Sequence, residues 1–177
     1  EFMNVFLKGR TKVSALYDKP NVNGLDDFIT STREKFGARM FPINISGLRQ
    51  VFKSLERNEL LVFLPDQVPD YGARGFIGTF FGHDAYTSDL VHRVISKYDS
   101  EIVFGLVMRD FSEGSLKYRI CFEKPEDEIY SKDIGVHISS LNRSLERLVM
   151  KAPEQYHWSY KRYKRLNKSE KNIYRRQ

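Results

Sequence analysis

Apolar residues recur at helical spacing in four parts of the chain, and each part predicts an amphipathic helix. Local signals mark the helix ends. Gly37 stops the first helix, Asn44 or Ser46 caps the second, residues 87–89 cap the third, and Pro153 follows the last. The expected helices cover residues 25–36, 45–55, 90–98 and 134–149.

Four shorter segments have the pattern of strands, and they cover residues 12–17, 59–64, 102–108 and 116–122. The second and third are mostly unbroken apolar runs, so we expect interior strands. The fourth alternates apolar and polar residues, which is typical of a strand that is wet on one face. Residues 123–133 are expected to be a polar linker. Strands separated by helices predict an α/β fold with a partly parallel mixed sheet flanked by helices.

The passage from Pro65 to Gly82 is rich in turn residues, and we expect it to form a long mobile loop. Its glycines make no phosphate-binding fingerprint, since neither a G-x-G-x-x-G nor a Walker pattern is present. Phe76, Phe80 and Phe81 are expected either to plug the core or to line an apolar pocket. Ligands of α/β sheets gather where strands end, so we look for chemistry where the strand 59–64 enters this passage.

The chain has 177 residues, of which 41% are hydrophobic and 29% charged. This composition predicts one globular domain and argues against a disordered chain. The single cysteine, Cys121, cannot form an internal disulfide, which is typical of a reducing compartment, and it excludes zinc sites made of several cysteines. The apolar stretches are too short to cross a bilayer and no signal peptide is visible, so we expect a soluble cytosolic domain.

Positive charge is concentrated at the C-terminal end. Residues 159–177 carry eight Lys and Arg side chains against one Glu, a net charge of +7, which leaves −1 of the total of +6 for residues 1–158. Tyr160, Tyr163 and Tyr174 are interleaved with these cations. The segment is either a solvated terminus or a surface for an anionic partner, and both acidic lipid and nucleic acid fit.

Few side chains indicate chemistry by position alone. Asp66 follows a predicted strand, where it is either a turn-capping residue or a site residue. Arg33 lies at the edge of an apolar helix stripe, where it is either solvated or able to reach a phosphate or carboxylate. None of the four histidines has a metal-ligating neighbour at helical spacing, and no G-x-S-x-G elbow is present. From the residues alone, no catalytic base can be named.

Four segments together resemble one known family. Residues 15–20 resemble a "VYRP" strand end, residues 64–67 a "PDQ" motif, and residues 75–82 a "GVFVPFFG" motif. Residues 152–158, followed by residues 161–164, resemble the longest motif, "APEQYxWxHRRFK". In the order and spacing of these segments, the chain resembles the lipid A biosynthesis acyltransferases, the lauroyl and myristoyl transferases of the lysophospholipid acyltransferase superfamily.

The resemblance covers about residues 13–165 and implies an acyltransferase-like sandwich that is incomplete at the N-terminus. The family's N-terminal portion carries a membrane-anchoring helix and an H-x4-D/E motif, whose histidine takes the proton of the acceptor hydroxyl. No histidine here forms this motif, because the residues at the acidic position are Ser88, Lys97, Asn142 and Arg162.

In register, Glu1 falls close to the acidic residue of that motif, which would place the catalytic histidine five positions upstream of this chain. The alternative is that Glu1 and Phe2 are a cloning scar. We expect residues 1–165 to be the C-terminal portion of one acyltransferase domain and residues 166–177 to be a basic tail. Such a fragment is expected to show little or no transfer activity by itself.

The resemblance also implies roles for single residues. Glu1, Arg33 and Asp66 are expected to be catalytic: Glu1 orients the histidine, Arg33 meets an anionic substrate group or the developing oxyanion, and Asp66 organises the site. The phenylalanines are expected to line an acyl channel. In the last motif Tyr160 replaces a histidine, although the basic charge is kept. The residues expected to bind substrate are Gln67, Phe76, Phe80, Phe81, Gly82, Lys161 and Arg162.

The implied partners are an acyl carrier protein as acyl donor, a lipid A precursor as acceptor, and an anionic membrane surface at the cytoplasmic face of the bacterial inner membrane. No cofactor, metal or nucleic acid is implied. The alternative is a non-catalytic module that binds anionic lipid or nucleic acid through the basic tail, and deletion of residues 166–177 separates the two. A glycerolipid acyltransferase is disfavoured by the PEQY segment, residues 153–156.

Overall fold

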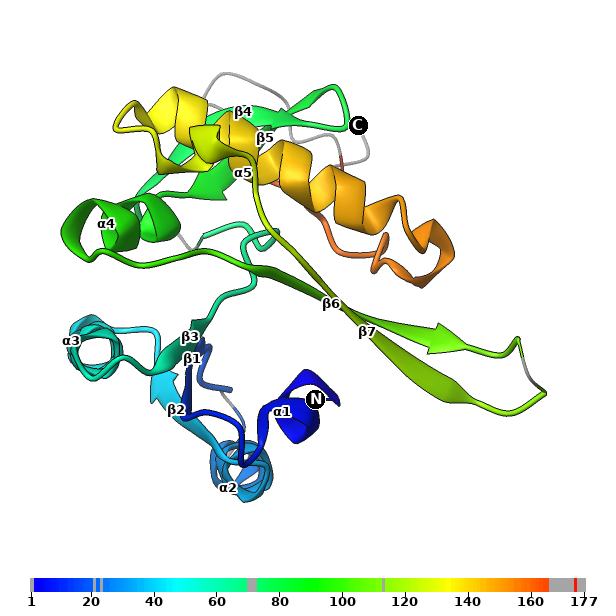
Figure 1. The fold of residues 1–177 in the computed structure, drawn as a ribbon. Coiled ribbons are helices and arrows are strands. Elements are labelled where there is room, and N and C mark those ends of the chain that lie inside the picture. Colours follow the sequence, from blue (N-terminus) through cyan, green and yellow to red (C-terminus); the bar gives the residue numbers. More distant parts are fainter. Residues whose placement is uncertain are drawn as a thin grey trace. The chain divides into compact units, whose positions relative to one another are not determined.

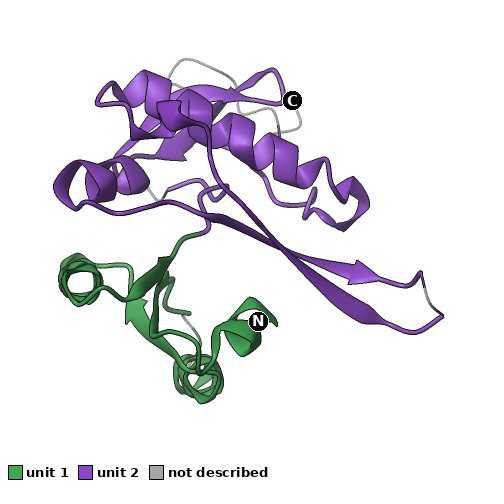
Figure 2. Cartoon of the chain, in the orientation of Figure 1, with its two compact units in different colours: residues 1–63 green, residues 64–177 purple. Residues whose placement is uncertain are grey.

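A computed structural model describes residues 2–20, 22, 24–69, 73–112, 114–165 and 174. The chain divides into two compact units, residues 1–63 and residues 64–177, which are coloured separately in Figure 2. Each unit has its own strands, helices and apolar core.

Unit 1 is built on a parallel sheet of three strands in the order β2-β1-β3 (Figure 1). Val13 of the central strand is in register with Ala38 of β2 and with Leu60 of β3. This pairing confirms the partly parallel α/β fold predicted from the sequence. The elements of unit 1 are α1 (Phe2–Leu7), β1 (Val13–Tyr17), α2 (Leu25–Lys35), β2 (Ala38–Pro42), α3 (Ile45–Glu56) and β3 (Leu60–Val62).

The helices of unit 1 cover both faces of its sheet because the chain reverses its direction across the sheet at β2. It passes from β1 to β2 through α2, and then from β2 to the other side of β1 through α3. Parallel crossovers are right-handed, so two crossovers in opposite directions place α2 and α3 on opposite faces. Leu7, Val13 and Ala38 form the buried apolar cluster, and Met40 and Leu60 pack against it.

Local chemistry sets the helix ends in unit 1. The side chain of Asn44 accepts a 2.8 Å hydrogen bond from the backbone N–H of Gly47, so Asn44 and not Ser46 caps α3. Gly37 follows α2 with a φ of 86°, a left-handed conformation that glycine adopts without a steric penalty. Both predicted helices therefore begin and end close to where the sequence places them.

Strand β2 has no signal of its own in the sequence. Its five residues, Ala-Arg-Met-Phe-Pro, mix polar and apolar side chains without a regular pattern. All five pair with successive residues of β1. The strand therefore depends on its partner rather than on local preference, which is common for short strands.

Unit 2 contains two antiparallel hairpins, one long helix and several short helical segments. α5 packs along β4, and their shared core includes Phe80, Ile138, Leu141 and Leu145. Among the described residues, no helix is long and apolar enough to cross a bilayer. The elements of unit 2 are β4 (Gly75–Phe80), β5 (His83–Ser88), α4 (Leu90–Lys97), β6 (Phe104–Asp110), β7 (Lys117–Glu123), η1 (Asp127–Tyr130), α5 (Ile134–Val149) and η2 (Pro153–Gln155).

The passage from Pro65 to Gly82 is not the long loop that its prolines and glycines predict. β4 and β5 form a regular hairpin, with Phe80 paired to His83 across a two-residue turn. Gly78 lies within β4 for a steric reason, because a Cβ there would come within 2.5 Å of Cγ2 of Ile138. This glycine permits close packing of β4 on α5 instead of marking a turn.

The prediction of an interior strand over 102–108 is also wrong. β6 pairs antiparallel with β7 in a sheet of two strands, and Figure 1 shows them as a long twisted ribbon. β7 itself confirms the strand that the alternating pattern predicts. Large apolar side chains in and beside the ribbon are exposed, and they are Val103, Phe111, Leu116, Tyr118 and Phe122.

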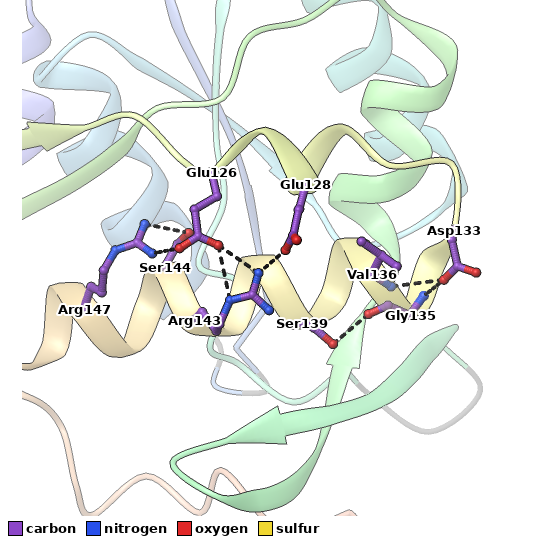
Figure 3. A network of polar contacts seen from close by, with 9 residues as sticks. All are labelled: Glu126, Glu128, Asp133, Gly135, Val136, Ser139, Arg143, Ser144 and Arg147. Atoms are coloured by element: carbon purple, nitrogen blue, oxygen red, sulfur yellow. Dashed lines mark hydrogen bonds and ion pairs between the residues drawn. The ribbon is translucent and has the colours of Figure 1, made fainter.

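The expected polar linker before α5 is an ordered segment. Ile129 of η1 is completely buried, with 0% of its surface exposed. On its surface side, Glu126 accepts a 2.8 Å hydrogen bond from Arg143 and pairs with Arg147, and Arg143 also pairs with Glu128 (Figure 3). Arg143 lowers the pKa of the Glu126 carboxyl below its ordinary value. Exposed ion pairs contribute little singly, so Ile129 supplies the main attachment of the segment to the core.

A buried histidine on α5 links the stability of unit 2 to pH. His137 is 0% exposed, and its Nδ1–H donates to the carbonyl of Ile129. Its Nε2 has no hydrogen-bond partner among the described residues, and its ring lies 5.0 Å from that of His92. Burial lowers the pKa of His137 and the charge of His92 adds to this, while the bond to Ile129 opposes it. The folded protein therefore protonates His137 less readily than the unfolded chain does.

We expect unit 2 to lose stability as the pH falls below the ordinary histidine pKa of 6.5, because the unfolded chain then binds a proton at His137 that the folded state resists. His137→Asn keeps a donor for the Ile129 carbonyl but does not titrate. As the pH falls, the free energy of unfolding of this variant should therefore decrease less than that of the wild type, by up to ~1.4 kcal/mol per pH unit. Urea unfolding at about pH 8 and about pH 5.5, followed by the fluorescence of the single Trp158, measures the difference. His83→Asn, at an exposed position, is the control. An unchanged pH dependence in His137→Asn contradicts the assignment.

Candidate functional site

Asp66 lies in the loop after β3, at the start of unit 2. Its side chain is half-buried, and its Oδ2 accepts a 3.2 Å hydrogen bond from the hydroxyl of Tyr156, 90 residues further along the chain. Burial, and then the charge of Asp66, raise the pKa of the Tyr156 hydroxyl well above its ordinary value. Tyr156 therefore remains a protonated donor to this carboxylate at neutral pH. This long-range bond shows that Asp66 takes part in the tertiary structure, and its role as a site residue stays a prediction.

The guanidinium of Arg162 is buried in the same unit, with only 2% of the residue exposed. Nη1 donates a 2.8 Å hydrogen bond to the carbonyl of Tyr86, and Nη2 donates a 2.6 Å bond to the hydroxyl of Thr87. Nε has no hydrogen-bond partner among the described residues. Burial lowers the pKa of Arg162, while the neighbouring Tyr156 and Asp66 act in the opposite direction. Asp66 therefore favours the charged form of Arg162, although burial is the larger effect on this pKa.

Aromatic rings extend from this polar group. The Arg162 guanidinium lies 5.3 Å from the ring centroid of Phe80, which is 1% exposed and fills the core. Phe81 packs edge-on against Phe80 at 4.8 Å and lies 5.7 Å from Trp158. Trp158 packs edge-on against Tyr156 at 4.8 Å. A row of rings therefore connects the turn of the β4–β5 hairpin to the phenol that binds the carboxylate.

Phe81 occupies the hairpin turn in an unusual backbone conformation. Its φ is 47° and that of Gly82 is 76°, so both turn residues are left-handed, as a type I′ turn requires. A left-handed conformation costs a bulky residue on the order of 1–2 kcal/mol. The backbone N–H of Phe81 donates a 2.7 Å hydrogen bond to the carboxylate of Glu146 on α5, which helps to hold the turn. A functional role for this ring stays a prediction.

The other residues expected to bind substrate are spread over unit 2. Gln67 is exposed in the same loop as Asp66. Phe76 is 42% exposed and stands at the opposite end of β4 from the hairpin turn. Lys161 is exposed, and its Nζ lies 5.8 Å from the ring of Tyr174. Substrate contacts for these residues stay predictions.

The other two residues expected to be catalytic do not belong to this cluster of unit 2. Arg33 lies in unit 1, half-buried on the last turn of α2. Glu1 lies outside the described residues. The structure thus brings together, among the expected site residues, Asp66, Phe80, Phe81 and Arg162.

Two members of the cluster, Tyr156 and Trp158, are not singled out from the sequence. Both stand within the motif over residues 152–158, and that motif is the signal that could have identified them. Among the described residues, no group of three or more His, Cys, Asp or Glu side chains could hold a metal ion. The cluster offers a carboxylate, a phenol, a buried cation and partly exposed rings.

Comparison with known proteins assigns the chain to a family. The family described as bacterial lipid A biosynthesis acyltransferase matches residues 2–165. The chain belongs to this family. Its sequence motifs predict the same lipid A acyltransferase family, and the match confirms that prediction.

Several bacterial relatives of this acyltransferase family are similar to the chain. It is 29% identical to the lipid A biosynthesis palmitoleoyltransferase of Escherichia coli (strain K12), over 98% of this chain and 56% of the relative. The same values hold for the lipid A biosynthesis acyltransferase of Shigella flexneri. It is 26% identical to the lipid A biosynthesis lauroyltransferase of Escherichia coli (strain K12), over 82% of this chain and 47% of the relative. The chain spans about half the length of the curated relatives it matches.

We expect Arg162→Lys to lower the free energy of unfolding of unit 2 by about 1–3 kcal/mol. A lysine ammonium cannot reproduce the planar fork that reaches both the Tyr86 carbonyl and the Thr87 hydroxyl, so one buried acceptor loses its partner. Urea unfolding followed by Trp158 fluorescence measures the change. The matched control is Lys161→Ala at the exposed neighbouring position, which should stay within about 0.5 kcal/mol of the wild type. Equal unfolding midpoints for Arg162→Lys and the wild type argue against a buried two-bond anchor.

Proposed function

We propose that residues 1–165 are the C-terminal portion of an acyltransferase domain that transfers a fatty acyl chain from acyl carrier protein to a hydroxyl of a lipid A precursor. The observation that carries this proposal is the family match over residues 2–165. The names of two relatives also describe acyl transfer in lipid A biosynthesis. The chain by itself is proposed to show little or no transfer.

The proposed reaction is a direct transfer without an acyl-enzyme intermediate. A histidine takes the proton of the acceptor hydroxyl while the hydroxyl oxygen attacks the thioester carbonyl, and the thiol of the carrier protein leaves with a proton. Glu1 is proposed to hold this histidine in the correct tautomer and to offset its positive charge. The four histidines of the chain do not fill the role, since none has an acidic residue at the required spacing.

Arg33 and Asp66 are proposed to complete the catalytic group. Arg33 would stabilise the oxyanion of the tetrahedral intermediate or an anionic group of the substrate, because a guanidinium suits both. Asp66 would organise the site. The bond from Tyr156 supports this role, since a half-buried carboxylate with a fixed donor is well suited to positioning.

Substrate contacts are proposed for the surface around this cluster. The partly exposed rings of Phe76 and Phe81 are suited to an acyl chain, and Phe80 supports them from the core. Gln67 and Gly82 are proposed to contact the polar part of the substrate. Buried Arg162 is proposed to act through electrostatic attraction, and exposed Lys161 through direct contact.

The basic C-terminal end is proposed to face the anionic inner membrane from the cytoplasmic side. Its net charge of +7 over residues 159–177 supports this, because each cation near acidic lipid contributes about 1 kcal/mol. Both proposed substrates are also anionic. The same charge keeps a second candidate function open, a non-catalytic module that binds anionic lipid or nucleic acid.

We expect Arg33→Ala to lower kcat/KM for acyl transfer by roughly 10²-fold or more in the natural full-length protein, as loss of a transition-state contact does. Asp66→Ala should lower it by a similar factor, because a site without its organising residue is misaligned. The assay follows transfer of a labelled acyl chain from acyl carrier protein to a lipid A precursor. Arg49→Ala and Asp99→Ala, both at exposed positions, are the matched controls and should retain wild-type rates. Normal turnover in Arg33→Ala or Asp66→Ala removes that residue from the catalytic group.

Deletion of residues 166–177 distinguishes the two candidate functions. The enzyme proposal expects weaker binding to vesicles that contain acidic lipid, with an intact fold and a retained transfer rate on detergent-dispersed substrate. The binding-module alternative expects vesicle or nucleic-acid binding to be the main activity and to collapse on deletion. Vesicle co-sedimentation at low and high salt, beside the transfer assay, measures both, because electrostatic binding weakens with salt.

A further inference from the structure

One segment near the C-terminal end holds the loop that carries Asp66. The loop is residues 65–69, and we call the segment, residues 156–165, the brace. Three hydrogen bonds join them, although the two are separated by about half of the chain. The bonds run from the Tyr156 hydroxyl to the Asp66 carboxylate (3.2 Å), from the Val68 N–H to the Tyr160 hydroxyl (2.8 Å) and from the Arg165 guanidinium to the Pro69 carbonyl (2.9 Å).

The brace is itself fixed to the most regular part of unit 2. Arg162 binds the Tyr86 carbonyl and the Thr87 hydroxyl of β5. The hydroxyl of Tyr163 donates a 3.0 Å hydrogen bond to the carbonyl of Phe80 in β4. Because the brace contacts both strands of the hairpin, it ties the loop to a paired sheet that packs on α5.

The bond between Val68 and Tyr160 satisfies a buried backbone group. Val68 is 6% exposed, so its N–H has little access to water. Buried N–H groups without a partner are rare in folded proteins because they lose their hydration without replacement. The Tyr160 hydroxyl therefore fixes the backbone two residues after Asp66, while the Tyr156 hydroxyl fixes the carboxylate itself.

We propose that the brace sets the orientation of the Asp66 carboxylate, with Tyr156 and Tyr160 acting on the reaction as positioning residues. A carboxylate in a site must be held within about 0.5 Å of its working position. The Tyr156 hydroxyl holds the Asp66 carboxylate and the Tyr160 hydroxyl holds the backbone beside it, and both tyrosines belong to the anchored brace. The effect on turnover rests on the function proposed above for Asp66. The holding of the loop by the brace does not rest on it.

The proposal gives the longest sequence motif a physical role other than contact with substrate. Tyr156 belongs to the motif over residues 152–158, and Arg162 belongs to its continuation. Their hydroxyl and guanidinium groups contact the protein itself. The motif then acts by holding a distant loop in place.

The first test measures hydrogen exchange at the amide of Val68 in the 177-residue chain. Tyr160→Phe should speed this exchange about tenfold, since the amide loses its acceptor, while the ring is retained. Tyr130→Phe is the matched control, because its hydroxyl also accepts a backbone N–H, that of Ile102, elsewhere in unit 2. Tyr130→Phe should leave the exchange rate of the Val68 amide unchanged, and the two variants are compared where their unfolding midpoints are equal. Unchanged exchange at Val68 in Tyr160→Phe overturns the brace.

The second test is a double-mutant cycle on acyl transfer in the natural full-length protein. Tyr156→Phe should lower kcat about tenfold with little change in KM, and it should have no further effect in the Asp66→Asn background. Tyr130→Phe should leave kcat unchanged. Additive effects of Tyr156→Phe and Asp66→Asn, or a normal kcat in Tyr156→Phe, show that Tyr156 does not act through Asp66.

Failure of the inference and failure of the proposed function look different. If the function is wrong, the full-length protein transfers no acyl chain, while the contrast in Val68 exchange between Tyr160→Phe and Tyr130→Phe persists. If the inference is wrong, transfer is normal and depends on Asp66, but the Tyr156→Phe and Tyr160→Phe variants behave as the wild type.

Discussion

The burial of one cation shapes unit 2. Arg162 is 2% exposed, and a charged group in such a place must have partners, because the loss of water is otherwise too unfavourable. Its partners are a backbone carbonyl and a hydroxyl on β5. This requirement fixes the brace to the β4–β5 hairpin, and the brace in turn binds the loop after β3.

Unit 1 is organised by a different constraint, the parallel pairing of β1 with strands on both sides. The reversal of direction at β2 places α2 and α3 on opposite faces of the sheet. Asp66 follows the third of these strands by only a few residues, and Arg33 lies on the helix between the first two. The residues proposed for catalysis thus come from the ends of regular elements, which is where α/β folds usually carry their sites.

The sequence predicts the parts of this fold that have a regular apolar period. α2, α3, α5 and β7 follow from spacing alone, while residue type leaves Asn44 and Ser46 open as the cap of α3 and the structure shows that it is Asn44. The β4–β5 hairpin does not follow from spacing. Gly75 and Gly78 look like turn residues in the sequence, but they lie within β4, where the absence of a side chain permits close packing. The short β2 depends wholly on its partner strand.

Prediction of the site has a similar limit. A motif identifies Asp66 and Arg162 as important, but spacing carries no information on the bond from Tyr156 to a residue 90 positions away. That contact joins two segments far apart in the sequence, so it depends on the tertiary fold. The burial of Phe80 likewise depends on the facing surface of α5, which no local pattern specifies.

The left-handed backbone of Phe81 has a consequence for how this protein can vary. Asparagine or glycine would form the same turn with less strain, so natural selection for stability alone would favour them. The Phe81 ring packs against Phe80 and Trp158, so the strained turn and the row of rings belong to one arrangement. Glycine or asparagine at position 81 would relax the turn but remove a ring from that row, so the net change in the free energy of unfolding is the difference between these two effects.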